Sequence, residues 1–194
     1  MAEYNLRSNF VFAPPEDSPA AWQASLETFR NALARAFPDA FLETNTSSLR
    51  DVPVLDFEIE VAPDVFVTGT AAMPAPDYAH VSIIDVTADA AALFAQWLRD
   101  SYVPSPAGVR FLSSLVMENG DETPWPLAAT GDAAEIEAVL RNHLPARCRV
   151  PRWVRAPAPA PTAPTAPRAT RLRRPSGAAP NARARSPRTG VRCP

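Results

Sequence analysis

Alternation of apolar and polar residues predicts most of the secondary structure of this chain, because side chains on a strand point to opposite faces in turn. The clearest run is residues 54–61, where Leu55, Phe57 and Ile59 share one face and three acids share the other. A proline-containing turn then leads to residues 65–72, which we expect to form the hairpin partner. Further strands are expected at residues 4–12, 41–44, 79–86 and 109–117.

Three segments show the spacing of an amphipathic helix, with apolar residues recurring every three or four positions. The first carries apolar residues from Trp22 to Phe37, and we expect Ser18 to cap it and Pro19 to occupy its first position. Thr87 is the expected cap of the second helix. Asp132, followed three residues later by Glu135, predicts the start of the third.

The predicted order of elements is β-α-β-β-β-β-α-β-α. Consecutive strands favour an antiparallel sheet, and single apolar stripes favour helices that cover one side of it. We therefore predict an α+β fold, a two-layer sandwich that is ferredoxin-like in outline and has a partly wet outer face. Prolines on both sides of Trp125 indicate a loop or an edge strand there.

The formal net charge of -2 conceals a strong segregation of charge along the chain. Residues 1–146 contain all 21 acidic residues and seven of the 19 basic ones, which gives a net charge of -14. Residues 147–194 contain the other 12, all arginine, and no acid. This second segment is rich in Arg, Pro and Ala and has few large apolar residues, so we predict an acidic domain at 1–146 and a disordered tail at 147–194.

Three interpretations of the tail remain open. Its arginines could neutralise phosphates of a nucleic acid, with salt-sensitive and sequence-independent binding. The tail could instead lie against the acidic domain of the same chain at high effective concentration. It could also be the product of a frameshift or read-through near Pro145, since acids vanish abruptly at that point.

Several function classes lack their usual sequence signals. Both cysteines lie in the tail without zinc-finger spacing, and no glycine-rich phosphate loop is recognisable, so we expect no cofactor. His80 and His143 are expected to be structural, and the Ser113-Ser114 pair lacks the flanking glycines of a hydrolase elbow. No signal peptide and no long apolar run is found, so we expect a cytoplasmic protein that does not contact a membrane.

Two groups of side chains are candidates for function. Asp56, Glu58 and Glu60 recur on one face of a strand, about 6.6–7 Å apart, where they could help to hold a divalent metal or simply face solvent. Trp125 follows a second acidic group that contains Glu118, Asp121 and Glu122. The tryptophan could plug the end of the sheet or anchor a partner.

An acidic domain without catalytic equipment attracts basic partners, so we expect a protein-binding module. In outline it resembles the bacterial immunity proteins that neutralise basic toxins, particularly nucleases. The resemblance implies that an acidic face fills the phosphate-binding cleft of the toxin. The expected contact residues are Asp56, Glu58, Glu60, Glu118, Asp121, Glu122 and Trp125. The alternatives are a metal-dependent enzyme that uses the Asp56/Glu58/Glu60 face and a protein that binds nucleic acid through the tail.

Overall fold

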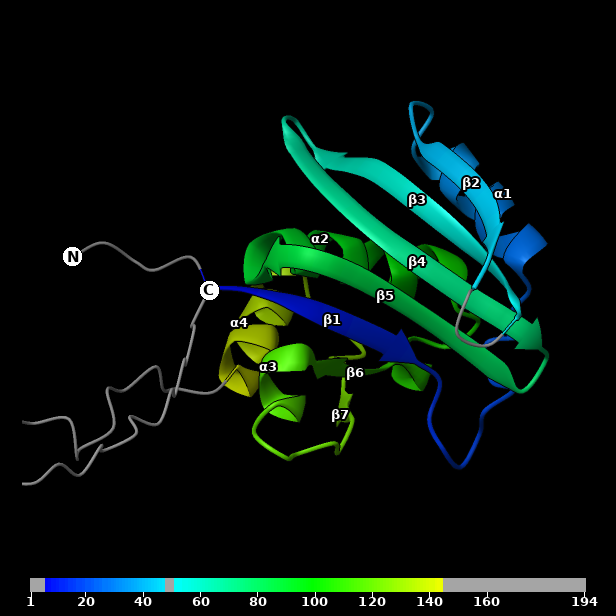
Figure 1. The fold of residues 1–194 in the computed structure, drawn as a ribbon. Coiled ribbons are helices and arrows are strands. Elements are labelled where there is room, and N and C mark those ends of the chain that lie inside the picture. The colour runs from blue at the N-terminus through cyan, green and yellow to red at the C-terminus, as the bar shows by residue number, and fades with distance from the viewer. Residues whose placement is uncertain (1–5, 48–50, 145–194) are drawn as a thin grey trace, which may run out of the picture. The chain divides into compact units, whose positions relative to one another are not determined.

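A computed structural model describes residues 6–47 and 51–144. The expected disordered tail, and the beginning of the first expected strand, lie outside the described residues. Seven strands form one antiparallel sheet in the order β2-β3-β4-β5-β1-β6-β7 (Figure 1). The strands are β1 (Arg7–Ala13), β2 (Phe41–Thr46), β3 (Pro53–Ala62), β4 (Val65–Ala75), β5 (Tyr78–Thr87), β6 (Arg110–Ser113) and β7 (Trp125–Pro126).

Helices cover one face of this sheet and leave the other face uncovered (Figure 1). The helices are α1 (Leu26–Ala36), α2 (Ala88–Trp97), α3 (Ser114–Met117) and α4 (Ala133–His143), and a π-helical turn, η1 (Leu98–Tyr102), continues α2. None of the helices in the described residues is long and apolar enough to cross a membrane. The predicted α+β class with a mostly antiparallel sheet is confirmed, with four helices where three were expected. The strand order does not confirm the ferredoxin-like outline.

The central hairpins follow directly from the period-two pattern. In β3 the side chains of Leu55, Phe57 and Ile59 are buried, whereas those between them face outward. Strand β3 pairs with β4 through a turn in which Asp64 adopts a positive φ of 61°, a conformation that Asp tolerates better than most residues. Strand β5 then lies between β4 and β1.

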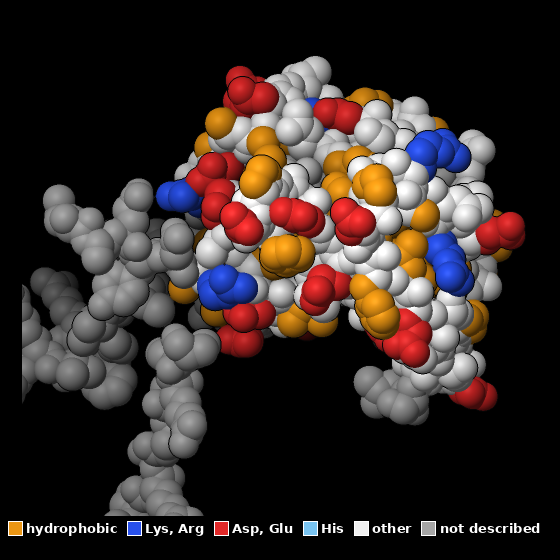
Figure 2. Space-filling view, turned by 90° about the horizontal axis from the view of Figure 1, so that it is seen from above, with side chains coloured by type: hydrophobic (Ala, Val, Ile, Leu, Met, Phe, Trp, Pro, Cys, Tyr) orange, Lys and Arg blue, Asp and Glu red, His pale blue; other side chains and the backbone are white. Residues whose placement is uncertain are grey.

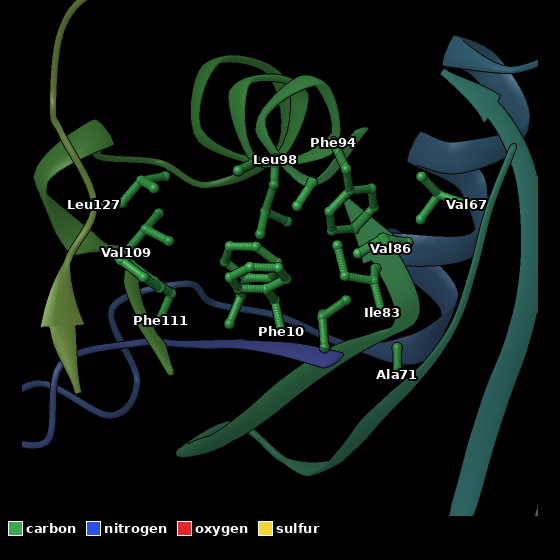
Figure 3. Close-up of a cluster of buried hydrophobic side chains, with 14 of the residues drawn as sticks. Phe10, Val67, Ala71, Ile83, Val86, Phe94, Leu98, Val109, Phe111 and Leu127 are labelled. Atoms are coloured by element: carbon green, nitrogen blue, oxygen red, sulfur yellow. The ribbon is translucent and has the colours of Figure 1, made fainter. Parts of the chain in front are cut away.

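Aromatic rings join the helices to the sheet in the core (Figure 3). Phe94 of α2 lies 5.7 Å from Phe12 of β1 and 5.8 Å from Phe57 of β3, measured between ring centroids. Phe57 in turn lies 5.9 Å from Phe29 of α1. Because such rings bury large apolar areas, this chain of contacts joins α1 and α2 to strands β1 and β3 in one core.

The first helix begins later than predicted. Its N-cap is Ser25, whose side chain accepts a hydrogen bond from the Thr28 amide at 3.1 Å, whereas Ser18 and Pro19 belong to a series of turns. Gln23 has a φ of 48°, which interrupts any helix that starts before it. Trp22 is nevertheless buried, because the turn carries it into the core; this is why the apolar stripe extended beyond the helix.

The predicted strand at residues 109–117 is also too long. Strand β6 ends at Ser113, and residues 114–117 form the short helix α3. Val116 of that helix is buried, whereas a strand that continued the pattern of Phe111 and Ser113 would bury residues 115 and 117 instead. Asp132 caps α4 as predicted, because its carboxylate accepts a hydrogen bond from the Glu135 amide at 3.1 Å.

Candidate partner-binding face

The uncovered side of the sheet, here called the open face, combines carboxylates with apolar side chains. Its residues alternate with the buried ones, as the period of two requires. Seen from above, at right angles to the view of Figure 1, the surface of the molecule carries acidic side chains with hydrophobic ones between them and few arginines (Figure 2). On strands β2 to β5 the open face comprises Phe41, Glu43, Asn45, Val54, Asp56, Glu58, Glu60, Phe66, Thr68, Thr70, Ser82 and Ile84.

The three predicted carboxylates of β3 lie on this face. Both oxygens of Asp56 are engaged, one by Thr70 at 2.8 Å and the other by Asn45 at 2.8 Å. Glu60 accepts the amide of Asp64 at 2.8 Å and so fixes the β3–β4 turn. Glu58 receives only a long hydrogen bond of 3.4 Å from Thr68, which leaves its carboxylate available to a partner. No arginine in the described part of the chain pairs with these three acids.

Large apolar side chains surround Glu58 and Glu60. Phe66 is 58% exposed and lies opposite Glu60, while Phe41 is 59% exposed and lies opposite Glu58. Ile84 is 45% exposed and faces Thr68, which places it diagonally beside Phe66. We call this group the Phe66 patch; it consists of Phe41, Glu58, Glu60, Phe66, Thr68 and Ile84.

Phe66 and Ile84 are not among the predicted contact residues, although the alternation along β4 and β5 places both on the outward face. Phe66 has the same parity as Thr68 and Thr70, so it belongs to the outward face of β4. Ile84 has the same parity as Ser82 on β5. A large apolar residue among outward-facing polar positions is expected to be exposed to solvent. Several such residues side by side indicate an interaction surface.

The second predicted group surrounds the far end of the sheet. Trp125 is 38% exposed, and its ring lies 4.8 Å from that of His143, with an interplanar angle of 66°. On its other side the His143 ring lies 4.9 Å from Phe111. Glu118, Asp121 and Glu122 are exposed in the loop that leads to β7. Trp125 therefore covers a histidine that is only 4% exposed, as a plug of the sheet would.

In this second group burial, rather than a neighbouring charge, sets the direction of the pKa shift of His143. Burial lowers the pKa of its imidazole below the ordinary value of 6.5, and the nearby negative charge of Asp121 opposes that effect. The amide of Thr123 donates to Asp121 at 3.0 Å and lowers the pKa of that carboxyl. His143 Nδ1 and Ser113 Oγ are buried and have no hydrogen-bond partner among the described residues. The arrangement buries Ser113 fully, so its hydroxyl is not placed for attack on a substrate.

The structure does not bring the two predicted groups together. Strand β3 is next to one edge of the sheet, β7 forms the other edge, and four strands lie between them. At a strand spacing of about 4.8 Å, the two groups are roughly 24 Å apart across the sheet. Trp125 pairs with the buried Phe111 and contacts His143 of α4, so it lies on the helix-covered side of the sheet. Glu58 lies on the open face, so no single flat surface of a partner can contact both.

The pockets of the described residues include two of moderate size. One of about 350 Å³ lies on the open face, where its walls include Val54, Thr70 and His80. Another of about 360 Å³ lies between α1 and α2, beside Phe37 and Trp97. Within residues 6–47 and 51–144, no group of three or more His, Cys, Asp or Glu side chains is arranged to hold a metal ion.

Comparisons with known proteins provide no assignment. No family model matches the chain, and neither the curated proteins nor the solved structures yield a significant match. The functional proposal therefore depends on the open face itself.

Proposed function

We propose that this chain is a protein-binding module whose partner is a basic protein, and that the Phe66 patch is the centre of its binding face. The finer form of the proposal is an immunity-type protein, in which the basic partner is a toxin. The observation that carries the proposal is the position of two exposed phenylalanines directly opposite Glu58 and Glu60.

Both components of the patch have a physical role in binding. Aromatic side chains supply most of the energy of many protein interfaces, because each buries a large apolar area. Carboxylates at the rim attract a basic partner and accelerate association, in a manner that salt weakens. The acidic balance of residues 1–146 extends the same attraction over the whole domain. Exposed phenylalanines alone would suit any apolar partner, whereas the neighbouring acids select a basic one.

The alternative of a metal-dependent enzyme finds less support. A metal site requires ligands that converge from several elements, whereas Asp56, Glu58 and Glu60 follow one another along a single strand. Asp56 and Glu60 also use their oxygens for hydrogen bonds within the domain.

The test uses the full chain and a labelled arginine-rich octapeptide as the probe, with binding measured by fluorescence anisotropy. Replacing Glu58 and Glu60 with Gln is expected to weaken binding about fivefold, since each exposed ion pair contributes roughly 0.2–1 kcal/mol. The matched control is the double change Glu16→Gln and Glu27→Gln, which removes the same charge away from the open face. All variants retain residues 147–194, so the effect of that segment cancels in the comparison.

A second variant tests the aromatic component. Phe66→Ala is expected to weaken binding of a folded basic protein about tenfold while leaving the net charge unchanged. Equal loss in the Glu58/Glu60 variant and in its control would show that only overall charge matters and would overturn the proposed face. For the immunity-type form, the readout is inhibition of a nuclease encoded beside the gene for this chain; a purely metabolic neighbourhood counts against it.

A further inference from the structure

Strand β2 (Phe41–Thr46) leaves one side of its backbone available for pairing. It pairs with β3 in continuous register, from Phe41 opposite Glu58 to Thr46 opposite Pro53, without a bulge. In the part of the chain that the structure describes, no strand lies on its outer side. Alternate amides and carbonyls of β2 therefore point outward, in the pattern that another strand would extend.

The two edges of the sheet differ in how they are protected. Strand β7 has only two residues, one of them Pro126, which has no amide to donate. Strand β2 has six residues and contains no proline, lysine or bulge, and its only charged residue is Glu43. The sheet is therefore blocked at one edge and open to extension at the other.

The side chains beside this edge indicate which kind of strand would fit. Phe41 and Glu43 are exposed on β2, and Asp56 and Glu58 follow them on β3. A strand added to β2 would place alternate side chains about 4.8 Å away, directly beside Phe41 and Glu43. Opposite charges in such cross-strand positions are favourable, and like charges are unfavourable.

Charge also discriminates against a second copy of this chain. If β2 paired with β2 of another copy, the open faces of the two copies would form one continuous surface. The carboxylates of Glu43, Asp56 and Glu58 from both copies would then lie close together and repel one another. A strand with Arg or Lys at alternate positions would instead place these cations on the open face beside Glu43, where opposite charges are favourable.

We propose that β2 is a docking edge to which an extended segment of the basic partner adds as a further strand. Main-chain hydrogen bonds to β2 supply affinity, and alternate basic side chains beside Glu43 supply specificity. This inference rests on the proposed function, since it assigns the mode by which the same partner is held.

The experiment uses the full chain and three labelled octapeptides that alternate arginine and valine. One is unmodified, and the other two carry N-methyl groups on alternate amides, in opposite parities. In one methylated peptide the methyl groups lie on the amides that face β2, so its hydrogen bonds to β2 are blocked. In the other they lie on the amides that face away from β2, so these hydrogen bonds remain possible. We expect one methylated peptide to bind at least tenfold more weakly than the unmodified one and the other to bind nearly as well.

Hydrogen exchange locates the binding. The unmodified peptide is expected to slow exchange of amides within residues 41–46, and Glu43→Gln is expected to weaken its binding about threefold, whereas Glu27→Gln leaves the affinity unchanged. Equal binding of the two methylated peptides, without protection of β2, overturns the docking edge. If the docking edge is overturned in this way but the Glu58/Glu60 variant still loses affinity, the proposed function stands without the docking edge. Dimerisation of the chain through β2 in the absence of peptide also overturns the inference.

Discussion

The imidazole Nε2 of His143 accepts a hydrogen bond from the backbone amide of Ser113 at 3.2 Å, although the two residues are 30 positions apart in the sequence. This bond joins the last turn of α4 to the end of β6. It requires that His143 Nε2 carry no proton, so protonation of the ring removes the acceptor.

Stability is therefore expected to fall in mildly acidic solution. The unfolded chain binds a proton at the ordinary histidine pKa of 6.5, whereas burial lowers the pKa of His143 in the folded state. Its contribution to the free energy of unfolding is complete above pH 6.5 and is lost as the pH falls from there towards the folded-state pKa, at no more than about 1.4 kcal/mol per pH unit.

Urea unfolding of the full chain at several pH values measures this effect. His143→Gln should flatten the dependence near pH 6, and the matched variant His80→Gln should retain it. The same slope in the His143→Gln variant and in the unmodified chain would assign the pH dependence to other groups.

Gly69 is expected to tolerate no side chain. It lies opposite Phe57 in the β3–β4 pair, and a Cβ at this position would come within 2.4 Å of the Ser82 carbonyl oxygen and 2.5 Å of Phe57 Cζ. We expect Gly69→Ala to lower the free energy of unfolding by about 2–3 kcal/mol, because the core must shift. Gly108→Ala adds the same methyl group where no atom lies within 4 Å, so its effect should be small.

The indole of Trp22 fixes the turns that precede α1. Its Nε1 donates to the Gly108 carbonyl at 2.6 Å, and the side chain is buried. Trp22→Phe should lower the free energy of unfolding by about 2 kcal/mol more than ring volume alone explains, because the carbonyl loses its partner. Trp97→Phe provides the comparison, since Trp97 makes ring contacts in the same cluster without an indole hydrogen bond. Equal losses in the two variants would show that the hydrogen bond contributes nothing.

Arg99 holds the segment before α4 in place. Its buried guanidinium donates to the carbonyls of Ala128, Thr130 and Gly131 at 2.9, 3.1 and 2.7 Å. Asp100 accepts two further bonds and raises the pKa of Arg99.

A lysine cannot satisfy this set of acceptors, so Arg99→Lys is expected to cost about 3 kcal/mol of stability. Hydrogen exchange should accelerate in α4, which residues 128–131 precede. Arg110→Lys changes an arginine that donates to Ala107 and Val109 nearer the surface, and it should cost less than about 1 kcal/mol. Unchanged exchange in the Arg99→Lys variant would refute this role.

The long strands were predictable because Leu55, Phe57 and Ile59 alternate with acids without interruption. The start of α1 was not, because Trp22 is buried from a turn and extends the helical stripe beyond the helix. The end of β6 was not predictable either, because the apolar residues 115–117 follow the strand without a break although they lie in α3. A pattern of burial reports which residues reach the core, and it does not distinguish the backbone conformations that bring them there.

The position of Asp56, Glu58 and Glu60 on an outward face also followed from the alternation. Their distance from Trp125 did not, because it depends on strand order, which long-range pairing decides. The exposure of Phe41 and Phe66 required the register between β2, β3 and β4 before it could be recognised as one patch.

The sheet order has a consequence for synthesis of the chain. Strand β1 leaves the ribosome first, yet its two neighbours are β5, which begins at Tyr78, and β6, which begins at Arg110. Phe10 and Phe12 therefore lie on an unpaired strand until β5, and then β6, have been synthesised. Nascent chains shorter than this expose a hydrophobic strand that chaperones can bind, and β1 gains its second neighbour only after β6 has been synthesised.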